Sequence, residues 1–146
     1  MAAADWSHAL DVLEERCRRE PGAVLGHVLA RLRAHPEDVA LALKGTPLYV
    51  RHTLDGGPAE GWVVFTGDGH VAVLGDDAVR PERTFPDLIV QGPARAVLAA
   101  VLGETEADAA LDAGVLIPMV PMDRLEPLLG LLRRELIAVA AGYTES

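Results

Sequence analysis

Few side chains in this sequence could carry out a reaction. The chain has one cysteine, Cys17, and its two serines, Ser7 and Ser146, lie near the ends, where the surroundings that activate a nucleophile are not expected. The sequence contains none of the patterns G-x-G-x-x-G, G-x-x-x-x-G-K-[ST], H-E-x-x-H or G-x-S-x-G, which mark nucleotide sites, zinc proteases and hydrolases. It therefore predicts no cofactor, and it favours a binding protein over an enzyme.

Three groupings of polar residues could in principle bind a metal or transfer a proton. His27 and His35 are eight residues apart, but no carboxylate or cysteine completes a metal site with them, so we predict none. Asp68 and His70 could pair as base and acid, although a turn would use the same residues. The acidic pair at residues 76 and 77 is expected to be solvated.

His52 is the strongest candidate for a polar group in a ligand site. It lies beside Arg51 in a run of strand-forming residues. Because successive side chains of a strand point to opposite faces, it faces either a buried pocket or the solvent side of a sheet. Tyr49 and Arg51 are the next candidates. Cys17 lies on the apolar stripe of a predicted helix and is interpreted as a core residue.

The composition excludes several classes of partner. The net charge of −9 at pH 7 would repel nucleic acids and anionic membranes, and 13 basic residues are dispersed among 22 acidic ones. No run approaches the roughly 20 apolar residues that cross a bilayer, and the first residues lack the basic start of a secretory signal. One cysteine forms no intramolecular disulfide. We therefore expect a cytoplasmic protein that binds no nucleic acid and does not insert stably into a membrane.

The first third of the chain is predicted to be helical. Apolar residues recur at helical spacing in residues 6–19 and 24–32, and a third, short helix is expected at 37–44, before Gly45. Residues 1–45 are interpreted as a helical extension packed on a second domain, residues 46–146. The extension could simply cover one face of a sheet, or it could form a lid, a dimer face or a surface for a partner.

Residues 46–146 are predicted to form one mixed sheet of five strands covered by helices, which is an α+β fold. The run Leu88-Ile89-Val90 shows no alternation of apolar and polar residues, which indicates an interior strand. The apolar run at 115–120 contains Pro118, which indicates an edge strand. The other predicted elements are strands at 48–54, 61–66 and 71–74 and helices at 94–102, 107–113 and from the capping residue Asp123 onward.

The segment from residue 86 to residue 132 resembles the second half of the sterol carrier protein family, also called the sterol transfer family. In that family a strand with a leading aspartate is followed by a helix ending in glycine, a short helix, a further strand and a C-terminal helix. The positions of this chain that match are Asp87, Ile89, Gly92, Leu98, Gly103, Ala110, Gly114, Leu116 and Asp123. The chain departs from the pattern in the prolines of its second strand and in Met122, where the family has glycine.

The resemblance implies an apolar tunnel between the sheet and the helices, with the C-terminal helix in its wall. The predicted ligand-binding residues in the matching elements are Leu98, Leu102, Leu111, Met119, Met122, Leu128, Leu129 and Leu132, to which the strand reasoning adds His52. The same aliphatic residues could instead fill one another's space as an ordinary core. A tunnel would show as a cavity of roughly several hundred Å³.

The predicted function is therefore non-catalytic binding or carrying of a lipid or another apolar small molecule. One alternative is an isomerase or cyclase that holds an apolar metabolite in a reactive shape. Another is an accessory module that docks on a partner enzyme, and a homodimer is a further possibility.

Overall fold

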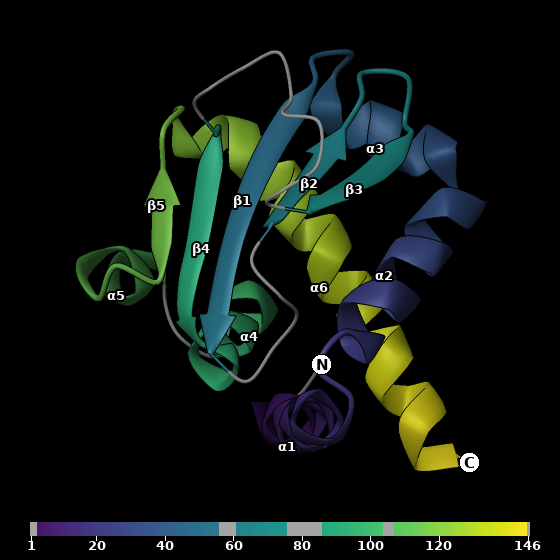
Figure 1. Cartoon of the computed structure of the whole chain (residues 1–146), viewed down its shortest axis with the longest axis vertical. Coiled ribbons are helices and arrows are strands. Elements are labelled where there is room, and N and C mark those ends of the chain that lie inside the picture. Colours follow the sequence, from purple (N-terminus) through teal and green to yellow (C-terminus); the bar gives the residue numbers. More distant parts are fainter. Residues whose placement is uncertain (1–2, 56–60, 76–85, 104–106, 146) are drawn as a thin grey trace.

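The computed structural model describes residues 3–55, 61–75, 86–103 and 107–145, and in this part of the chain one five-stranded sheet packs against helices (Figure 1). The strands are β1 (Leu48–Asp55), β2 (Gly61–Phe65), β3 (Val71–Gly75), β4 (Leu88–Pro93) and β5 (Leu116–Pro118). The helices are α1 (Ala3–Arg19), α2 (Ala23–Ala34), α3 (Pro36–Leu43), α4 (Ala94–Leu102), α5 (Ala107–Asp112) and α6 (Met122–Glu145). The predicted α+β class, with a mixed sheet and additional N-terminal helices, is confirmed.

β1 lies at the centre of the sheet, whose strand order is β3-β2-β1-β4-β5. It pairs antiparallel with β2 and parallel with β4, so the sheet is mixed. β4 is an interior strand, as its unbroken apolar run predicted. β5 lies at an edge, as Pro118 predicted, and it is shorter than expected because the ladder ends where Pro118 pairs with Leu88.

Asp87 ties the start of β4 to both neighbouring strands. Its carboxylate oxygen Oδ2 accepts a hydrogen bond from the N–H of Tyr49 at 2.9 Å, and its own N–H donates to the carbonyl of Tyr49 at 2.8 Å. The carbonyl of Asp87 accepts from the N–H of Met119 at 2.9 Å. Asp87 is only 2% exposed, so these partners replace the water that its polar atoms have lost. They also align β1, β4 and β5.

α6 joins the helical layer together, and Figure 1 shows it crossing behind the sheet. It begins at Met122, one residue before the predicted cap Asp123, which instead lies in the first turn, where the helix dipole favours a carboxylate. Its apolar stripe is buried, including Leu125, Leu128 and Leu136. Within the described residues, no helix is long and apolar enough to cross a membrane.

The N-terminal helices share their core with the rest of the chain. α1 packs against α4 and α6, and both α2 and α3 pack against α6. Leu13, Leu32 and Val39, one from each of these helices, belong to the same continuous cluster of buried residues as the sheet. The two parts that the sequence divides at residue 45 are therefore in intimate contact in the structure.

A buried carboxylate links α2, α3 and α6. Glu135 of α6 is 2% exposed and accepts from Arg31 of α2 at 2.5 Å and from Arg134 at 3.1 Å. Arg134 also contacts Asp38 of α3 at 3.0 Å. Since a buried charge is stable only with such partners, these arginines hold the N-terminal helices on α6.

We expect Arg31→Met to lower the free energy of unfolding by about 1–3 kcal/mol, because it leaves one oxygen of the buried Glu135 carboxylate without its closest partner. The measurement is the urea midpoint of unfolding, at constant m-value. Arg18→Met is the matched control, since the pair of Arg18 with Glu15 is exposed and contributes about 0–1 kcal/mol. Equal effects of the two substitutions would contradict the structural role of Glu135.

Candidate functional site

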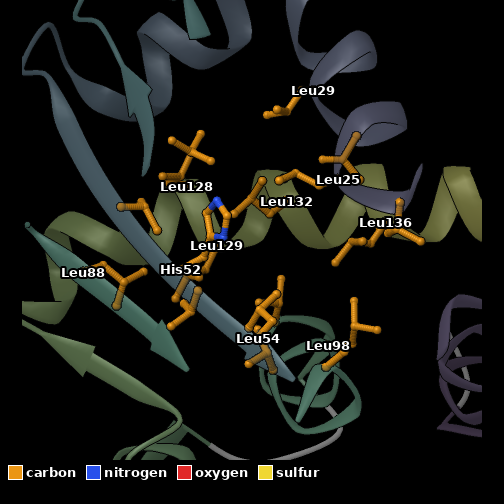
Figure 2. A pocket seen from close by; sticks show the side chains of 18 of the residues that line it. Leu25, Leu29, His52, Leu54, Leu88, Leu98, Leu128, Leu129, Leu132 and Leu136 are labelled. Carbon is orange, nitrogen blue, oxygen red and sulfur yellow. The ribbon is translucent and has the colours of Figure 1, made fainter. Parts of the chain in front are cut away.

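A cavity of about 150 Å³ lies between the sheet and the helices (Figure 2). Residues of α1, α2, β1, β2, β4, α4 and α6 form its wall. The described residues that line it are Cys17, Val24, Leu25, Val28, Leu29, Val50, His52, Leu54, Val63, Phe65, Leu88, Val90, Ala94, Val97, Leu98, Val101, Leu128, Leu129, Leu132 and Leu136. The wall is thus almost entirely hydrocarbon.

The helical part of the wall follows from amphipathic spacing. In α4, Ala94, Val97, Leu98 and Val101 line the cavity, and in α6 the lining positions are 128, 129, 132 and 136. Residues three and four apart share one face of a helix, so each helix presents a continuous apolar stripe to the sheet. The cavity is the space that these stripes do not fill.

Four leucines of the wall are less buried than the other lining residues. Leu25 of α2, Leu54 of β1 and Leu129 and Leu132 of α6 are half-buried, whereas the other lining residues are buried. These four side chains therefore keep the largest accessible fractions. They come from both layers of the molecule, so a ligand would lie between sheet and helices.

His52 supplies the polar group in this apolar wall. It is 5% exposed, and its ring points into the space between β1 and α6 (Figure 2). The strand alternation of β1 places it on the same face as Val50 and Leu54, toward the helices. Of the two alternatives that the sequence left open, the structure selects the buried face. Among the described lining residues, His52 is the only one with a side-chain nitrogen or oxygen.

Tyr49 and Arg51, the next candidates, do not line the cavity. They alternate with His52 along β1 and so belong to the opposite face of the sheet. There the guanidinium carbon of Arg51 lies over the ring of Trp62, 5.6 Å from its centre. This is a cation–π contact, which gives Arg51 a packing role on that face.

The structure brings together five of the nine predicted ligand-binding residues, namely Leu98, Leu128, Leu129, Leu132 and His52. The other four lie elsewhere. Leu102 is completely buried in the core, one helical turn beyond the lining residue Leu98. Leu111 and Met122 are half-buried against the core, and Met119, just after the short β5, is 53% exposed.

Sequence reasoning missed the part of the wall that α1 and α2 supply, which consists of Cys17, Val24, Leu25, Val28 and Leu29. The apolar stripe of residues 24–32 was the available signal. Periodicity shows that a helix buries one face, but not what that face packs against. The contribution of β2, through Val63 and Phe65, was also missed, because a strand pattern likewise does not show what each face packs against.

The other polar candidates lie apart from the cavity. Asp68 and His70 are exposed, with Nε2 of His70 3.6 Å from Oδ2 of Asp68. The hydroxyl of Thr66 donates a hydrogen bond to Asp68 and lowers the pKa of that carboxyl, as expected for residues of a turn.

His27, a candidate metal ligand, forms a hydrogen bond with the hydroxyl of Tyr143. No group of three potential metal ligands occurs in the described part of the chain, and residues 76 and 77 lie outside it.

The cavity is smaller than the several hundred Å³ expected of a tunnel. Its volume of about 150 Å³ is comparable to that of cavities that accept a single aromatic ring. Drug-sized ligands occupy roughly 300–1,000 Å³. The size therefore favours a small ligand.

Comparison with known proteins found a similar structure but no matching sequence family. No protein-family model matches the chain, and no curated protein matches it. The solution structure of the sterol carrier protein domain 2 of Helicoverpa armigera is similar to this structure, with a TM-score of 0.45 and 20% sequence identity. The similarity covers 74% of this chain and 84% of that one. At this level, it identifies neither a family nor a ligand.

Burial raises the pKa of the Cys17 thiol above its ordinary value of 9.0, and the nearby charge of Glu14 adds to this. The thiol therefore favours the folded state while it is protonated, and this contribution is lost as the pH rises beyond 9.0. We expect the stability of the natural protein to fall more steeply than that of Cys17→Ala between about pH 8.5 and about pH 10.5.

The measurement is chemical unfolding at several pH values. Tyr143 is present in both proteins, and burial also raises its pKa. Because the charge of Cys17 raises the pKa of Tyr143 further, the difference between the two slopes reports the thiol together with its effect on Tyr143. Parallel pH profiles would show that the Cys17 thiol ionises equally easily in the folded and unfolded states.

Proposed function

We propose that this protein binds and carries a lipid or another apolar small molecule in the cavity between its sheet and helices, without changing the molecule chemically. The observation that carries the proposal is the composition of the wall. Apart from His52 and Cys17, every described lining residue has a hydrocarbon side chain. Moving apolar surface from water into such a wall is favourable by about 25 cal/mol per Å².

The resemblance of residues 86–132 to the sterol carrier protein family supports the same proposal, because that family is expected to hold its ligand between equivalent layers. The resemblance does not extend to the N-terminal helices. In this chain, α2 supplies Val24, Leu25, Val28 and Leu29 to the wall. The N-terminal helices are therefore part of the proposed binding site.

Conversion of the bound molecule by an isomerase or cyclase is the second candidate, and the position of His52 favours it. An imidazole can take up or release a proton near neutral pH. The described wall offers no carboxylate, lysine or tyrosine to act with it. Within the described wall, a chemical change would therefore depend on His52 and the thiol of Cys17, which makes carrying the simpler function.

A homodimer and a partner enzyme remain predictions. The exposed large apolar side chains among the described residues are Leu41, Val73 and Met119. They belong to α3, β3 and the segment after β5, which are separate elements. Determination of the molar mass in solution at micromolar concentration checks whether the chain pairs with itself.

The carrier proposal predicts that protein isolated from its native cells contains an apolar molecule in about a one-to-one ratio. Native mass spectrometry followed by solvent extraction detects and identifies it. Leu132→Phe should lower the recovered amount at least about tenfold. Leu132 is a half-buried residue of the wall, and the larger phenyl ring at this position would fill part of the cavity. Leu111→Phe is the matched control, since Leu111 is half-buried but does not line the cavity.

Two results would overturn the carrier proposal. One is a protein that is empty on isolation and takes up no fatty acid, sterol, quinone or simple hydrocarbon when challenged. The other is equal loss of the ligand in Leu111→Phe and Leu132→Phe at unchanged stability, which would place binding outside the cavity. Release of an altered product from an added ligand would favour the second candidate.

A further inference from the structure

The cavity limits the size of the molecule that it accepts. Its volume of about 150 Å³ matches the space that a benzene-sized ligand occupies in an aliphatic core. A sterol, with four fused rings and a side chain, is several times larger. Most of the described lining residues, including Leu128 and Val90, are buried, so enlargement on their side would require movement of the close-packed core.

The wall also limits the charge of the ligand. None of its described residues is an aspartate, glutamate, lysine or arginine. The buried carboxylate of Glu135 belongs to the same helix as Leu132 and Leu136, but it is paired with Arg31 and Arg134. A charged ligand would lose its water without gaining a fixed opposite charge, which is unfavourable. An uncharged ligand fits the wall better.

His52 adds a polar contact to the described wall of the cavity. A neutral imidazole presents one N–H donor and one nitrogen acceptor, so it can pair with a hydroxyl, a carbonyl or an N–H group. The ring is 95% buried, and the residues beside it on the same face of β1, Val50 and Leu54, are aliphatic. Among the described lining residues, a polar atom of the ligand would therefore meet His52, and all the others except Cys17 have hydrocarbon side chains.

We propose that the ligand of this cavity is an uncharged molecule about the size of one aromatic ring, with one hydrogen-bonding group that pairs with His52. This inference rests on the proposed binding function and adds the size, the charge and the polar group of the ligand. Phenols and small cyclic alcohols or ketones have this chemistry. His52 sets the orientation of the ligand, and the leucines of α2 and α6 contact its ring.

The test compares p-cresol with p-xylene, which have nearly the same shape but differ in a hydroxyl and a methyl group. Titrations of the full chain, followed by the shifts of its backbone amide signals in NMR, give Kd for each compound. We expect the ratio of the Kd for p-xylene to the Kd for p-cresol to be about tenfold larger in the natural protein than in His52→Leu. His52→Gln retains a hydrogen-bonding side chain and should restore part of this preference.

Two controls separate recognition from folding. p-Xylene needs no hydrogen bond, so its binding to His52→Leu shows that the cavity is intact. In the natural protein, p-cresol should shift the imidazole signals of His52 more than p-xylene does, and this readout requires no substitution. A size series from p-cresol through 2-naphthol to cholesterol should show affinity falling with each increase in ring number.

The outcomes distinguish the two proposals. An unchanged Kd ratio in His52→Leu, with equal imidazole shifts for both compounds, overturns the role of His52 but leaves the carrier function. Stoichiometric binding of cholesterol or a long-chain fatty acid, with no binding of p-cresol, overturns the proposed size in the same way. If none of these compounds binds, the binding function itself fails.

Discussion

Burial of the apolar stripe of α6 is the constraint on which the rest of this molecule depends. The sheet lies on one side of this helix, and α1, α2 and α3 pack around it. Leu125 and Leu128 are almost completely buried there, which is typical of a helix that is apolar toward more than one neighbour. The ion pair of Arg31 with Glu135 then fixes how α2 sits on this helix, and the ion pair of Arg134 with Asp38 does the same for α3. Loss of this packing would expose the apolar faces of both the sheet and the helical layer to water.

The cavity is an exception to this close packing. Atoms that line it lack packing partners on the cavity side, so they forgo part of the dispersion attraction that a filled core would provide. Binding of an apolar molecule would offset part of this loss, because only the folded state offers the site. A ligand would therefore stabilise the contact between the N-terminal helices and the sheet, since residues from both line the cavity.

His52 is the imidazole in an otherwise aliphatic part of the cavity wall. Strand alternation directs its side chain toward the helices, where the described lining residues of α4 and α6 are aliphatic. A leucine at this position would satisfy the packing. The presence of an imidazole is therefore more informative about function than any leucine of the wall, because the leucines would be present in an ordinary core as well.

The sequence by itself determined the elements and much of the sheet. The unbroken run at Leu88 indicated an interior strand, Pro118 indicated an edge, and the leucine stripe indicated the long C-terminal helix, because these patterns follow from local geometry. Only the tertiary structure decided which stripes meet. It placed α2 in the cavity wall, left Leu111 and Met119 outside it and turned His52 inward, because the cavity is the space left between elements that are distant in sequence. Side chains of one strand or helix face can be assigned from spacing, but the volume between such faces depends on how every layer packs.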